Sequence, residues 1–403
     1  MAMWRAVRLG IATQAVRTVN WVSQRSGRGS GTVIGGTVGL FLAPELLTSL
    51  ASDRRVILVT GTNGKTTTTA LVAAGWDGDV TSNDTGANMP AGHVAALARS
   101  GATRVVLETD EAWLGATLEA TSPAVIVLLN LSRDQLDRAS EVRQIADRWR
   151  NFLAKPQAED AVIVANALDP LVVYAANEAS NVHWCATPTS WTADTMSCPR
   201  CTEPLLRTDD RWWCTCGLAQ PSVSSYLDGD VAVVGSKRVP LALELPGVFN
   251  RGNALMALTA LDAINVDLGR AASRMSSVGE VAGRYGLRRV DGQVVRLLLA
   301  KNPAGFAAML EGLGDVHDVW ISINARVADG HDPSWLYDVP FEVLRGRRVR
   351  CLGERRLDLA TRLWYAGVEA HVDEGRPAIE DRVIDVIANY TAFSDLLKES
   401  RPC

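Results

Sequence analysis

The chain has 403 residues, of which 47% are hydrophobic and 21% are charged. This length predicts two or three domains with a large buried core, and the composition is that of an ordinary globular protein. The formal net charge of −4 gives no whole-chain electrostatic reason to expect nucleic acid or an anionic membrane as a partner, and we predict no nucleic-acid partner.

Residues 1–50 are predicted to form an N-terminal helix and a glycine-rich lead-in, which we expect to be a turn. Trp4, Val7, Ile11 and Val16 recur at roughly helical spacing. This apolar side either packs on the core, which we favour, or contacts a membrane surface. We expect no transmembrane segment, because residues 31–50 are interrupted by glycines, a proline and a glutamate. Without a secretory signal, we predict a cytoplasmic chain, with any membrane contact at the inner face.

Residues 51–280 are predicted to form a nucleotide-binding α/β domain. Apolar runs alternate with helical patterns here, as expected for a parallel sheet that is buried on both faces. The expected strands lie at 56–59, 104–107, 124–129 and 161–164, and the expected helices at 66–74, 141–153 and 250–264.

A glycine-rich loop follows the first strand and precedes the first helix of this domain. Glycines let backbone N–H groups turn toward phosphate oxygens, and the helix N-terminus favours negative charge. Lys65 is expected to reach the β- and γ-phosphates of ATP, and the Thr66 hydroxyl to bind Mg²⁺. The alternative is a chance glycine turn. The predicted ATP-binding residues of the loop are Thr60, Gly61, Thr62, Asn63, Gly64, Lys65, Thr66 and Thr67.

Glu108 is the predicted carboxylate of the magnesium site. It ends the strand at 104–107, and ligands of open α/β sheets bind at the carboxyl ends of parallel strands. Mg²⁺ prefers one or two carboxylates together with phosphate oxygens. The alternative for Glu108 is a solvated acidic loop.

An insert at about 191–221 carries four clustered cysteines. Two close pairs of thiolates match a tetrahedral structural zinc site, and such a short insert is too small to build a core of its own. Unligated cysteines, redox chemistry and a nucleic-acid finger are the alternatives. The predicted Zn²⁺ ligands are Cys198, Cys201, Cys214 and Cys216.

Residues 285–403 are predicted to form a second, smaller α/β domain. Its expected strands lie at 294–299 and 319–323, with a last strand near Val349. An amphipathic helix is expected over 379–398.

Four segments together resemble the Mur ligases and folylpolyglutamate synthetases. They are the ATP signature at 59–68, the segment Asn130–Arg138, the segment Pro246–Ala254, and Gly283-Arg284. The resemblance implies a Mur-ligase-like central domain and ATP-driven activation of a carboxylate as an acyl phosphate, which an amine then attacks. It also implies that Asn253 and Arg284 contact the nucleotide. The alternative for these two residues is simple helix capping or a surface salt bridge.

Two departures from this family weaken the case for addition of an amino acid. Gln135 stands where the family has a histidine, and Arg148 stands where amino-acid-adding members carry a carbamylated lysine. Attack by ammonia would tolerate both changes. The alternatives that remain are a ligase that adds an amino acid and a nucleotide-binding scaffold without turnover.

The zinc insert and the C-terminal portion are similar to the MurT subfamily, the synthetase subunits of lipid II isoglutaminyl synthases. The similar blocks are Lys301–Gly305 and Asp329–Asp338. The first of them implies that Asn302 lies near the nucleotide. The resemblance implies amidation of the α-carboxylate of D-glutamate in the lipid II stem peptide, a step of peptidoglycan biosynthesis.

The resemblance further implies a two-chain enzyme whose ammonia comes from a class I glutamine amidotransferase of the GatD type. Asp332 would orient the partner's Cys–His pair as its third, carboxylate member. Asp338 in that role, or Asp332 as a simple turn cap, remain the alternatives. Cys351, the other candidate for glutaminase chemistry, is predicted to be a core thiol.

Overall fold

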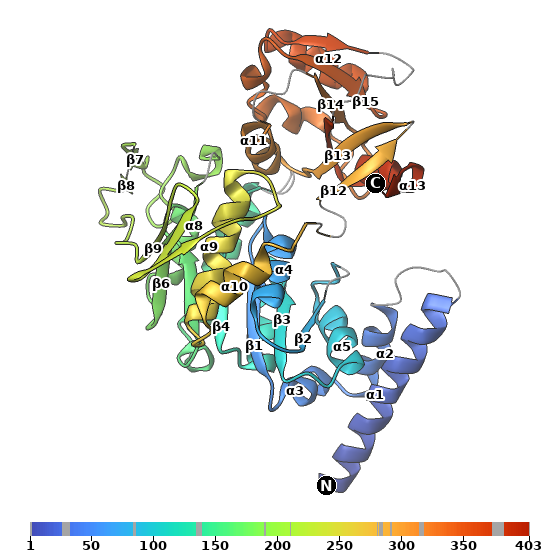
Figure 1. Ribbon diagram of the computed structural model, residues 1–403. Helices are drawn as coiled ribbons and strands as arrows, with labels where there is room; N and C mark the ends of the chain where they lie inside the picture. The colour runs from blue at the N-terminus through green and yellow to red at the C-terminus, as the bar shows by residue number, and fades with distance from the viewer. Residues whose placement is uncertain are drawn as a thin grey trace.

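The computed structural model describes residues 2–25, 33–83, 86–133, 139–188, 191–209, 211–279, 281, 285–290, 292–313, 318–372 and 383–402. Within these residues, no helix combines the length and the apolar character that crossing a bilayer requires. Figure 1 shows a larger sheet domain with three N-terminal helices along its edge, and a second sheet domain above it.

The larger domain is built on a nine-stranded sheet. Its first six strands in the chain are parallel, as predicted, and an antiparallel pair closes one edge. In spatial order the strands are β11 (Lys237–Pro240), β10 (Val231–Val234), β9 (Ser225–Asp228), β6 (Val182–Ala186), β5 (Val162–Asn166), β4 (Val125–Leu128), β1 (Arg55–Thr60), β3 (Arg104–Glu108) and β2 (Val80–Ser82).

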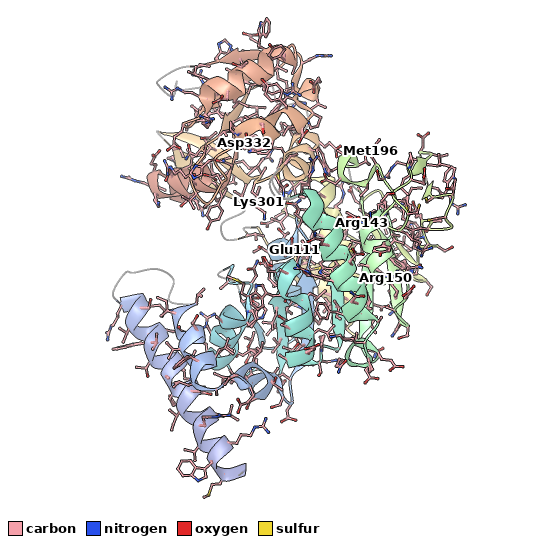
Figure 2. All side chains as sticks on the ribbon, turned by 180° about the vertical axis from the view of Figure 1, so that it is seen from behind. Glu111, Arg143, Arg150, Met196, Lys301 and Asp332 are labelled. Carbon is pink, nitrogen blue, oxygen red and sulfur yellow. The ribbon has the colours of Figure 1, made fainter. Side chains whose placement is uncertain are left out.

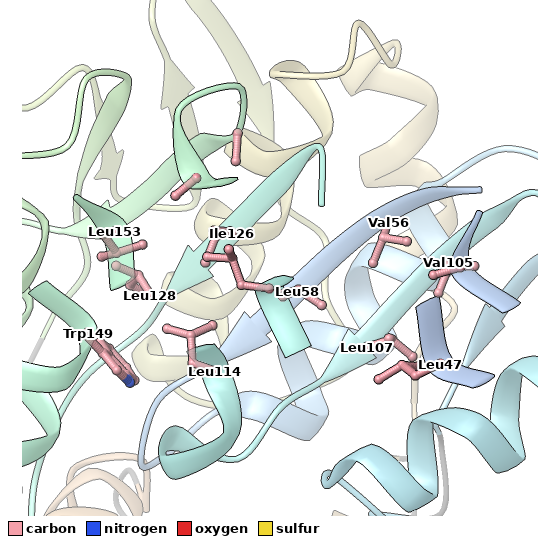
Figure 3. Packing of buried hydrophobic residues seen from close by; sticks show 14 of the residues in the cluster. Leu47, Val56, Leu58, Val105, Leu107, Leu114, Ile126, Leu128, Trp149 and Leu153 are labelled. Carbon is pink, nitrogen blue, oxygen red and sulfur yellow. The ribbon is translucent and has the colours of Figure 1, made fainter. Parts of the chain in front are cut away.

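Helices cover both faces of this sheet, and the side chains of each strand alternate between them. On β1, Val56 and Leu58 pack into one core, while Ile57 and Val59 pack into the other. Figure 3 shows the first of these cores. The first face is covered by α5 (Pro90–Arg99), α6 (Leu114–Thr121), α7 (Ala139–Leu153) and α8 (Pro170–Ala176), and the second by α4 (Lys65–Gly75), α9 (Val248–Asp262) and α10 (Leu268–Met275).

The N-terminal residues form three helices, where the glycine-rich lead-in was expected to be a turn. They are α1 (Ala2–Arg25), α2 (Ile34–Leu42) and α3 (Leu46–Ala51). The glycines of α2 are buried contact points. A Cβ on Gly36 would lie 1.7 Å from the backbone oxygen of Ala91, at the start of α5. Small residues here let the helices approach closely, which explains why glycine is compatible with this helix.

The apolar side of α1 does not pack on the core as we favoured. Val16 is buried, but Trp4, Val7 and Ile11 are exposed. The reason is geometric: Ala12 and Val16 face the first core, and the three exposed residues lie on the opposite side of the helix.

The C-terminal domain is a seven-stranded, mostly parallel sheet with an antiparallel edge. Helices α11 (Pro303–Glu311) and α12 (Arg356–Tyr365) pack into one core, and α13 (Tyr390–Glu399) packs into the other. In spatial order the strands are β16 (Glu369–His371), β15 (Arg348–Leu352), β14 (Asp318–Ser322), β17 (Ile384–Ala388), β13 (Gln293–Leu299), β12 (Tyr285–Val290) and β18 (Arg401–Pro402).

The strand expected near Val349 is present as β15, but three further strands follow it, and the long terminal helix expected over 379–398 is wrong. Residues 384–388 form β17, which lies between β14 and β13 and is buried on both faces. Its Asp385 is compatible with that position because Arg296 of β13 pairs with it, with Nη2 2.6 Å from Oδ2. The helix begins only at Tyr390.

Shorter elements complete the chain. The 3₁₀ helices are η1 (Glu111–Trp113), η3 (Pro156–Ala158), η4 (Ala193–Thr195), η5 (Pro333–Asp338) and η6 (Phe341–Leu344), and the insert holds the two-stranded ribbon of β7 (Leu206–Arg207) and β8 (Trp212–Trp213).

Candidate nucleotide and metal site

The phosphate loop, residues 60–67, connects β1 to α4 at the carboxyl edge of the large sheet. Gly61 and Gly64 have φ angles of 138° and 86°, which L side chains rarely adopt. A Cβ on Gly64 would also lie 2.6 Å from Oδ1 of Asn253 on α9. Backbone conformation and close approach therefore both require glycine here, and the predicted residue Asn253 lies against the loop.

Asn130, just beyond β4, holds the loop in place. Its Oδ1 accepts the Asn63 N–H at 2.9 Å, and its Nδ2 donates to the Asn63 carbonyl at 3.0 Å. The Thr62 N–H donates to the Asn130 carbonyl, also at 2.9 Å. Three bonds from one residue fix the loop before any ligand binds, which is the preorganisation that a phosphate site needs.

Lys65 is buried, with its side chain 6% exposed, and its ammonium group lies over its own loop. It donates to the carbonyls of Gly61 and Thr62 and lies 3.2 Å from Oε2 of Glu111. An ammonium removed from water needs such a counter-charge. Glu111 therefore neutralises the lysine that is predicted to bind phosphate.

Thr66 and Glu108, the two predicted Mg²⁺ ligands, lie side by side. The Thr66 hydroxyl donates to Glu108 Oε2 at 2.8 Å. Glu108 is 1% exposed, and its other oxygen, Oε1, is buried with no hydrogen-bond partner in the described part of the chain. A buried carboxylate oxygen is normally satisfied. A fixed carboxylate with one unused oxygen, beside a hydroxyl, fits a divalent cation.

The backbone of Glu108 is held by two neighbours. Asn83 accepts the Glu108 N–H and donates to its carbonyl, both at 2.8 Å. The His93 Nε2–H donates to the same carbonyl at 2.9 Å. Burial lowers the pKa of the His93 imidazole to about 4, so this ring is neutral near pH 7. The strand end is thus fixed by uncharged groups that leave the carboxylate free for the cation.

Asp169 is a second buried carboxylate beside the loop, and its part is structural. It caps α8 and accepts N–H groups of Leu171 at 2.9 Å and of Leu131 at 2.8 Å. Burial raises the pKa of this carboxyl to about 6, although the three N–H donors act in the opposite direction.

A cavity of about 200 Å³ lies between the two domains at the phosphate loop. Its walls include the loop, apolar side chains such as Phe249 and Met256, and Lys301 with Gly305 from the C-terminal domain. Figure 2 shows Glu111 and Lys301 at the facing edges of the two domains. An apolar pocket beside a phosphate cradle is suited to a purine nucleotide.

The other predicted nucleotide residues fall in different places. Asn302 is fully buried and caps α11, and its side-chain amide pairs with that of Asn63 at 3.3 Å. It therefore connects the C-terminal domain to the loop. Arg284 and Gln135 lie outside the described residues, and Arg148 is exposed on α7.

The four predicted zinc ligands converge. The Sγ atoms of Cys198, Cys201, Cys214 and Cys216 all lie within 4.8 Å of one another. A tetrahedral zinc with Zn–S bonds of about 2.3 Å separates its sulfurs by roughly 3.8 Å. The cluster therefore fits zinc. Trp212 anchors the insert, because its indole N–H donates to the Ala167 carbonyl at 3.1 Å.

Asp332 and Asp338 lie at the two ends of η5, in the C-terminal domain. Asp332 is exposed, well away from Glu111 (Figure 2), and its Oδ1 accepts the Ser334 N–H at 2.8 Å. This bond caps η5 and lowers the pKa of Asp332. Asp338 instead lies 3.7 Å from Nη2 of Arg133 in the larger domain. The capping contact that was the alternative for Asp332 is present, and Asp338 joins the two domains.

Glu111, Asn83 and Asn130 are site residues that sequence reasoning did not single out. Asn130 follows the end of β4 just as Glu108 ends β3, so the rule that identified Glu108 would have found it too. Glu111 lies three residues after Glu108 in the sequence, but nothing in the pattern shows which way its side chain points. Asn83 follows β2, a strand too short to be recognised.

Comparison with known proteins agrees with this geometry. The family model of the Mur ligase middle domain matches residues 59–261, just over half of the chain. The MurT ligase C-terminal model matches residues 299–393. Among solved structures, a pseudomurein peptide ligase type C from Methanothermus fervidus has a TM-score of 0.67 at 17% identity, covering 88% of this chain and 81% of that one. That likeness shows the fold.

Two curated relatives match almost end to end. The MurT subunit of lipid II isoglutaminyl synthase (glutamine-hydrolyzing) from Staphylococcus aureus (strain COL) is 27% identical, covering 99% of this chain and 98% of its own. The subunit of the same name from Streptococcus pneumoniae (strain ATCC BAA-255 / R6) is 26% identical, covering 95% of each chain. With its phosphate loop, its paired Thr66 and Glu108, and these matches, the chain belongs to the Mur ligase family of ATP-dependent ligases and joins that family's middle domain to a MurT-type C-terminal domain.

Proposed function

We propose that this chain amidates the α-carboxylate of D-glutamate in the lipid II stem peptide to D-isoglutamine, using ATP and ammonia. The observation that carries the proposal is the end-to-end similarity to the two MurT subunits of lipid II isoglutaminyl synthase. The chain retains the groups that this chemistry needs, namely a phosphate loop with its lysine and a buried carboxylate beside Thr66. Because the reaction uses cytoplasmic ATP and a membrane lipid, the enzyme acts in the cytoplasm, at the inner face of the membrane.

The reaction proceeds in two balanced steps. A carboxylate oxygen of the substrate attacks the γ-phosphorus of ATP, the bond to the β-γ bridging oxygen breaks, and ADP leaves. Ammonia then attacks the carbonyl carbon of the acyl phosphate, phosphate leaves with the former carboxylate oxygen, and the nitrogen loses a proton. One ATP and one ammonia give one amide, ADP and phosphate.

The residues of the phosphate loop divide the work of holding ATP. Backbone N–H groups of residues 60–67 bind the phosphates, and Lys65 leaves Glu111 to neutralise the γ-phosphate as charge moves during transfer. Thr66 and Glu108 would hold Mg²⁺, which would neutralise phosphate charge. Asn253 contacts the nucleotide beside the loop, and Asn302 positions Asn63 from the opposite domain.

A glutaminase partner of the class I type, similar to GatD, supplies the ammonia. The surface we assign to it is formed by η5 and α12. It carries exposed Tyr337, Trp364 and Tyr365, whose neighbouring rings have centroids 6.5 Å and 5.0 Å apart. Exposed aromatic side chains are typical of protein interfaces. Asp332 lies at the start of η5 and would complete the partner's Cys–His pair from this surface.

The zinc site stabilises the insert and takes no part in the reaction. The insert packs only a small core, which contains Val173, Trp212 and Leu218 besides cysteines. A closed four-sulfur site leaves zinc no open position for substrate.

The experiment compares two aspartates in the purified two-chain enzyme with ATP, Mg²⁺ and lipid II. Asp332→Asn should abolish amidation from glutamine and retain amidation from ammonium, because the synthetase site is untouched. Asp338→Asn, the matched control, should retain both activities. Two results contradict the role assigned to Asp332 in the partner's active site. One is loss of both activities in Asp332→Asn. The other is loss of glutamine use in Asp338→Asn while Asp332→Asn retains it. A wild-type enzyme that makes no amide from either source refutes the proposed function itself.

A further inference from the structure

The outward side of α1 carries large apolar side chains that nothing in the described part of the chain covers. We call the exposed residues Met3, Trp4, Val7, Ile11, Trp21 and Val22 the α1 stripe. They share one side of the helix, because residues three, four and seven apart lie above one another. Trp4 is 77% exposed and Ile11 is 60% exposed. The stripe runs about 28 Å, at 1.5 Å per residue.

The inner side of the same helix already supplies the contacts that folding needs. Ala12 and Val16 are completely buried in the first core, and Leu9 packs against it. A surface helix of a globular protein normally carries polar residues on its outer side. The α1 stripe is therefore apolar surface in excess of what the fold uses, and large apolar patches of this kind mark binding surfaces.

The neighbouring helix α2 lies against the inner side of α1, where Gly39 approaches Val16. α2 packs on α1, and it exposes Ile34 and Phe41, the latter 87% exposed. Figure 1 shows α1 along the outer edge of the molecule, with α2 between it and α5. Nothing in the described part of the chain lies over α1 on its outer side.

The charge around the stripe is positive, against the sign of the whole protein. The first 44 residues contain five arginines and no lysine, aspartate or glutamate, whereas the chain as a whole has a net charge of −4. The guanidinium carbon of Arg25 lies 4.7 Å from the centroid of the Trp21 ring. Glu45 pairs with Arg8 and lies 3.9 Å from Arg5, so one acid offsets part of this charge.

We propose that the α1 stripe docks on an anionic phospholipid bilayer, with α1 lying in the interface. Tryptophan and arginine beside aliphatic side chains are the residues that interfacial helices use, because the rings and aliphatic groups enter the headgroup region while the cations remain near lipid phosphates. A second copy of the chain fits less well, since a two-fold contact through this face would bring the arginines of both copies together. The inference extends the proposed action on lipid II by naming the surface that brings the enzyme to it.

The test is co-sedimentation of the full chain with vesicles of phosphatidylcholine alone and of phosphatidylcholine with phosphatidylglycerol. We expect binding to the anionic vesicles to be roughly tenfold stronger, and to weaken with added salt. Trp4→Glu/Ile11→Glu should lower that binding by roughly tenfold or more. The matched control Tyr226→Glu/Leu287→Glu, which adds two charges at exposed strand positions, should bind as the wild type does. An unchanged melting temperature shows that each variant is folded.

Three results overturn the inference. They are a wild type that stays in the supernatant, equal binding by the wild type and Trp4→Glu/Ile11→Glu, and light scattering that shows a dimer which this variant dissolves. The measurement needs neither ATP nor an acceptor. Failure of vesicle binding is therefore distinguishable from failure of amidation.

Discussion

Glu108 carries the most specific chemical evidence in the site. One of its oxygens accepts the Thr66 hydroxyl, and the other is buried without a hydrogen-bond partner in the described chain. An unsatisfied buried carboxylate oxygen is unfavourable, so a protein keeps one only where something else supplies the positive charge. The three backbone bonds from Asn83 and His93 fix the strand end that carries it.

Glu108→Gln should lower ATP turnover by roughly a hundredfold, because loss of a metal ligand removes several kcal/mol of charge stabilisation. The Mg²⁺ concentration that gives half-maximal rate should rise as well. The matched control is Asp110→Asn, since the Asp110 side chain caps η1 through the Ala112 N–H. Steady-state rates over a Mg²⁺ titration measure both effects. An unchanged Mg²⁺ dependence in Glu108→Gln would contradict the assignment.

His93 makes stability depend on pH. Burial lowers the pKa of its imidazole from 6.5 to about 4. The unfolded chain therefore takes up a proton at a higher pH than the native chain does. The contribution of neutral His93 to the free energy of unfolding is therefore complete above pH 6.5. It is lost as the pH falls toward 4, and for a pKa shift of this size the loss is roughly 3 kcal/mol.

Removal of this imidazole should flatten the pH dependence. The free energy of unfolding of His93→Gln should fall less than that of the wild type between pH 6.5 and 4, as measured by denaturant titration. His371→Gln is the control, because that ring is half-exposed and pairs with Glu369 at the surface. Parallel curves for His93→Gln and the wild type would rule out a buried, neutral His93.

The sequence allowed prediction of those site residues whose role follows from a local pattern. Thr66 and Glu108 were both predicted as Mg²⁺ ligands, and the structure brings them into contact. The contact of Lys65 with Glu111 was not predictable, because the direction of a side chain after a strand depends on the three-dimensional packing. Likewise, Asn302 is far from Asn63 in the sequence, and only the placement of the two domains brings their amides together.

The insert that holds the four clustered cysteines is an element whose stability we expect to depend on a bound metal. Its two strands, β7 and β8, have two residues each, and its core is small. Such a segment gains most of its folding free energy from a structural metal.

Purified protein should contain one zinc per chain, measured by inductively coupled plasma mass spectrometry. Cys198→Ser/Cys201→Ser should lose the metal, and the insert should become sensitive to protease. Cys351→Ala is the matched control, because it removes a buried cysteine that is outside the cluster. Wild-type protein without zinc, or a double variant that retains it, would contradict a four-cysteine site.

Prediction succeeded for the parallel strands and failed for two other kinds of element. Continuous apolar runs identify buried strands such as β4 well. β17 was mistaken for helix because its apolar run is short and contains Asp385, whose partner Arg296 lies on another strand. α2 was taken for a glycine-rich turn, since the reason for its glycines is the close approach of α1 and α5.

The two domains of the protein meet at the phosphate loop. Asn63 pairs with Asn302 across the domain boundary, and Arg133 lies 3.7 Å from Asp338. The cavity between the domains has walls from both. Closing such a site around its reactants excludes water, which would otherwise hydrolyse an acyl phosphate. The surfaces proposed for the glutaminase and for the membrane lie on different parts of the molecule, η5–α12 and α1, so both can be engaged at once.

The most direct test of this account follows oxygen from substrate to phosphate. Lipid II with ¹⁸O in the α-carboxylate of D-glutamate is incubated with the chain, ATP, Mg²⁺ and ammonium, and the inorganic phosphate is analysed by mass spectrometry. Activation as an acyl phosphate predicts one ¹⁸O in phosphate for each amide formed. Amide formation with ¹⁸O in AMP, or with unlabelled phosphate, would contradict the account.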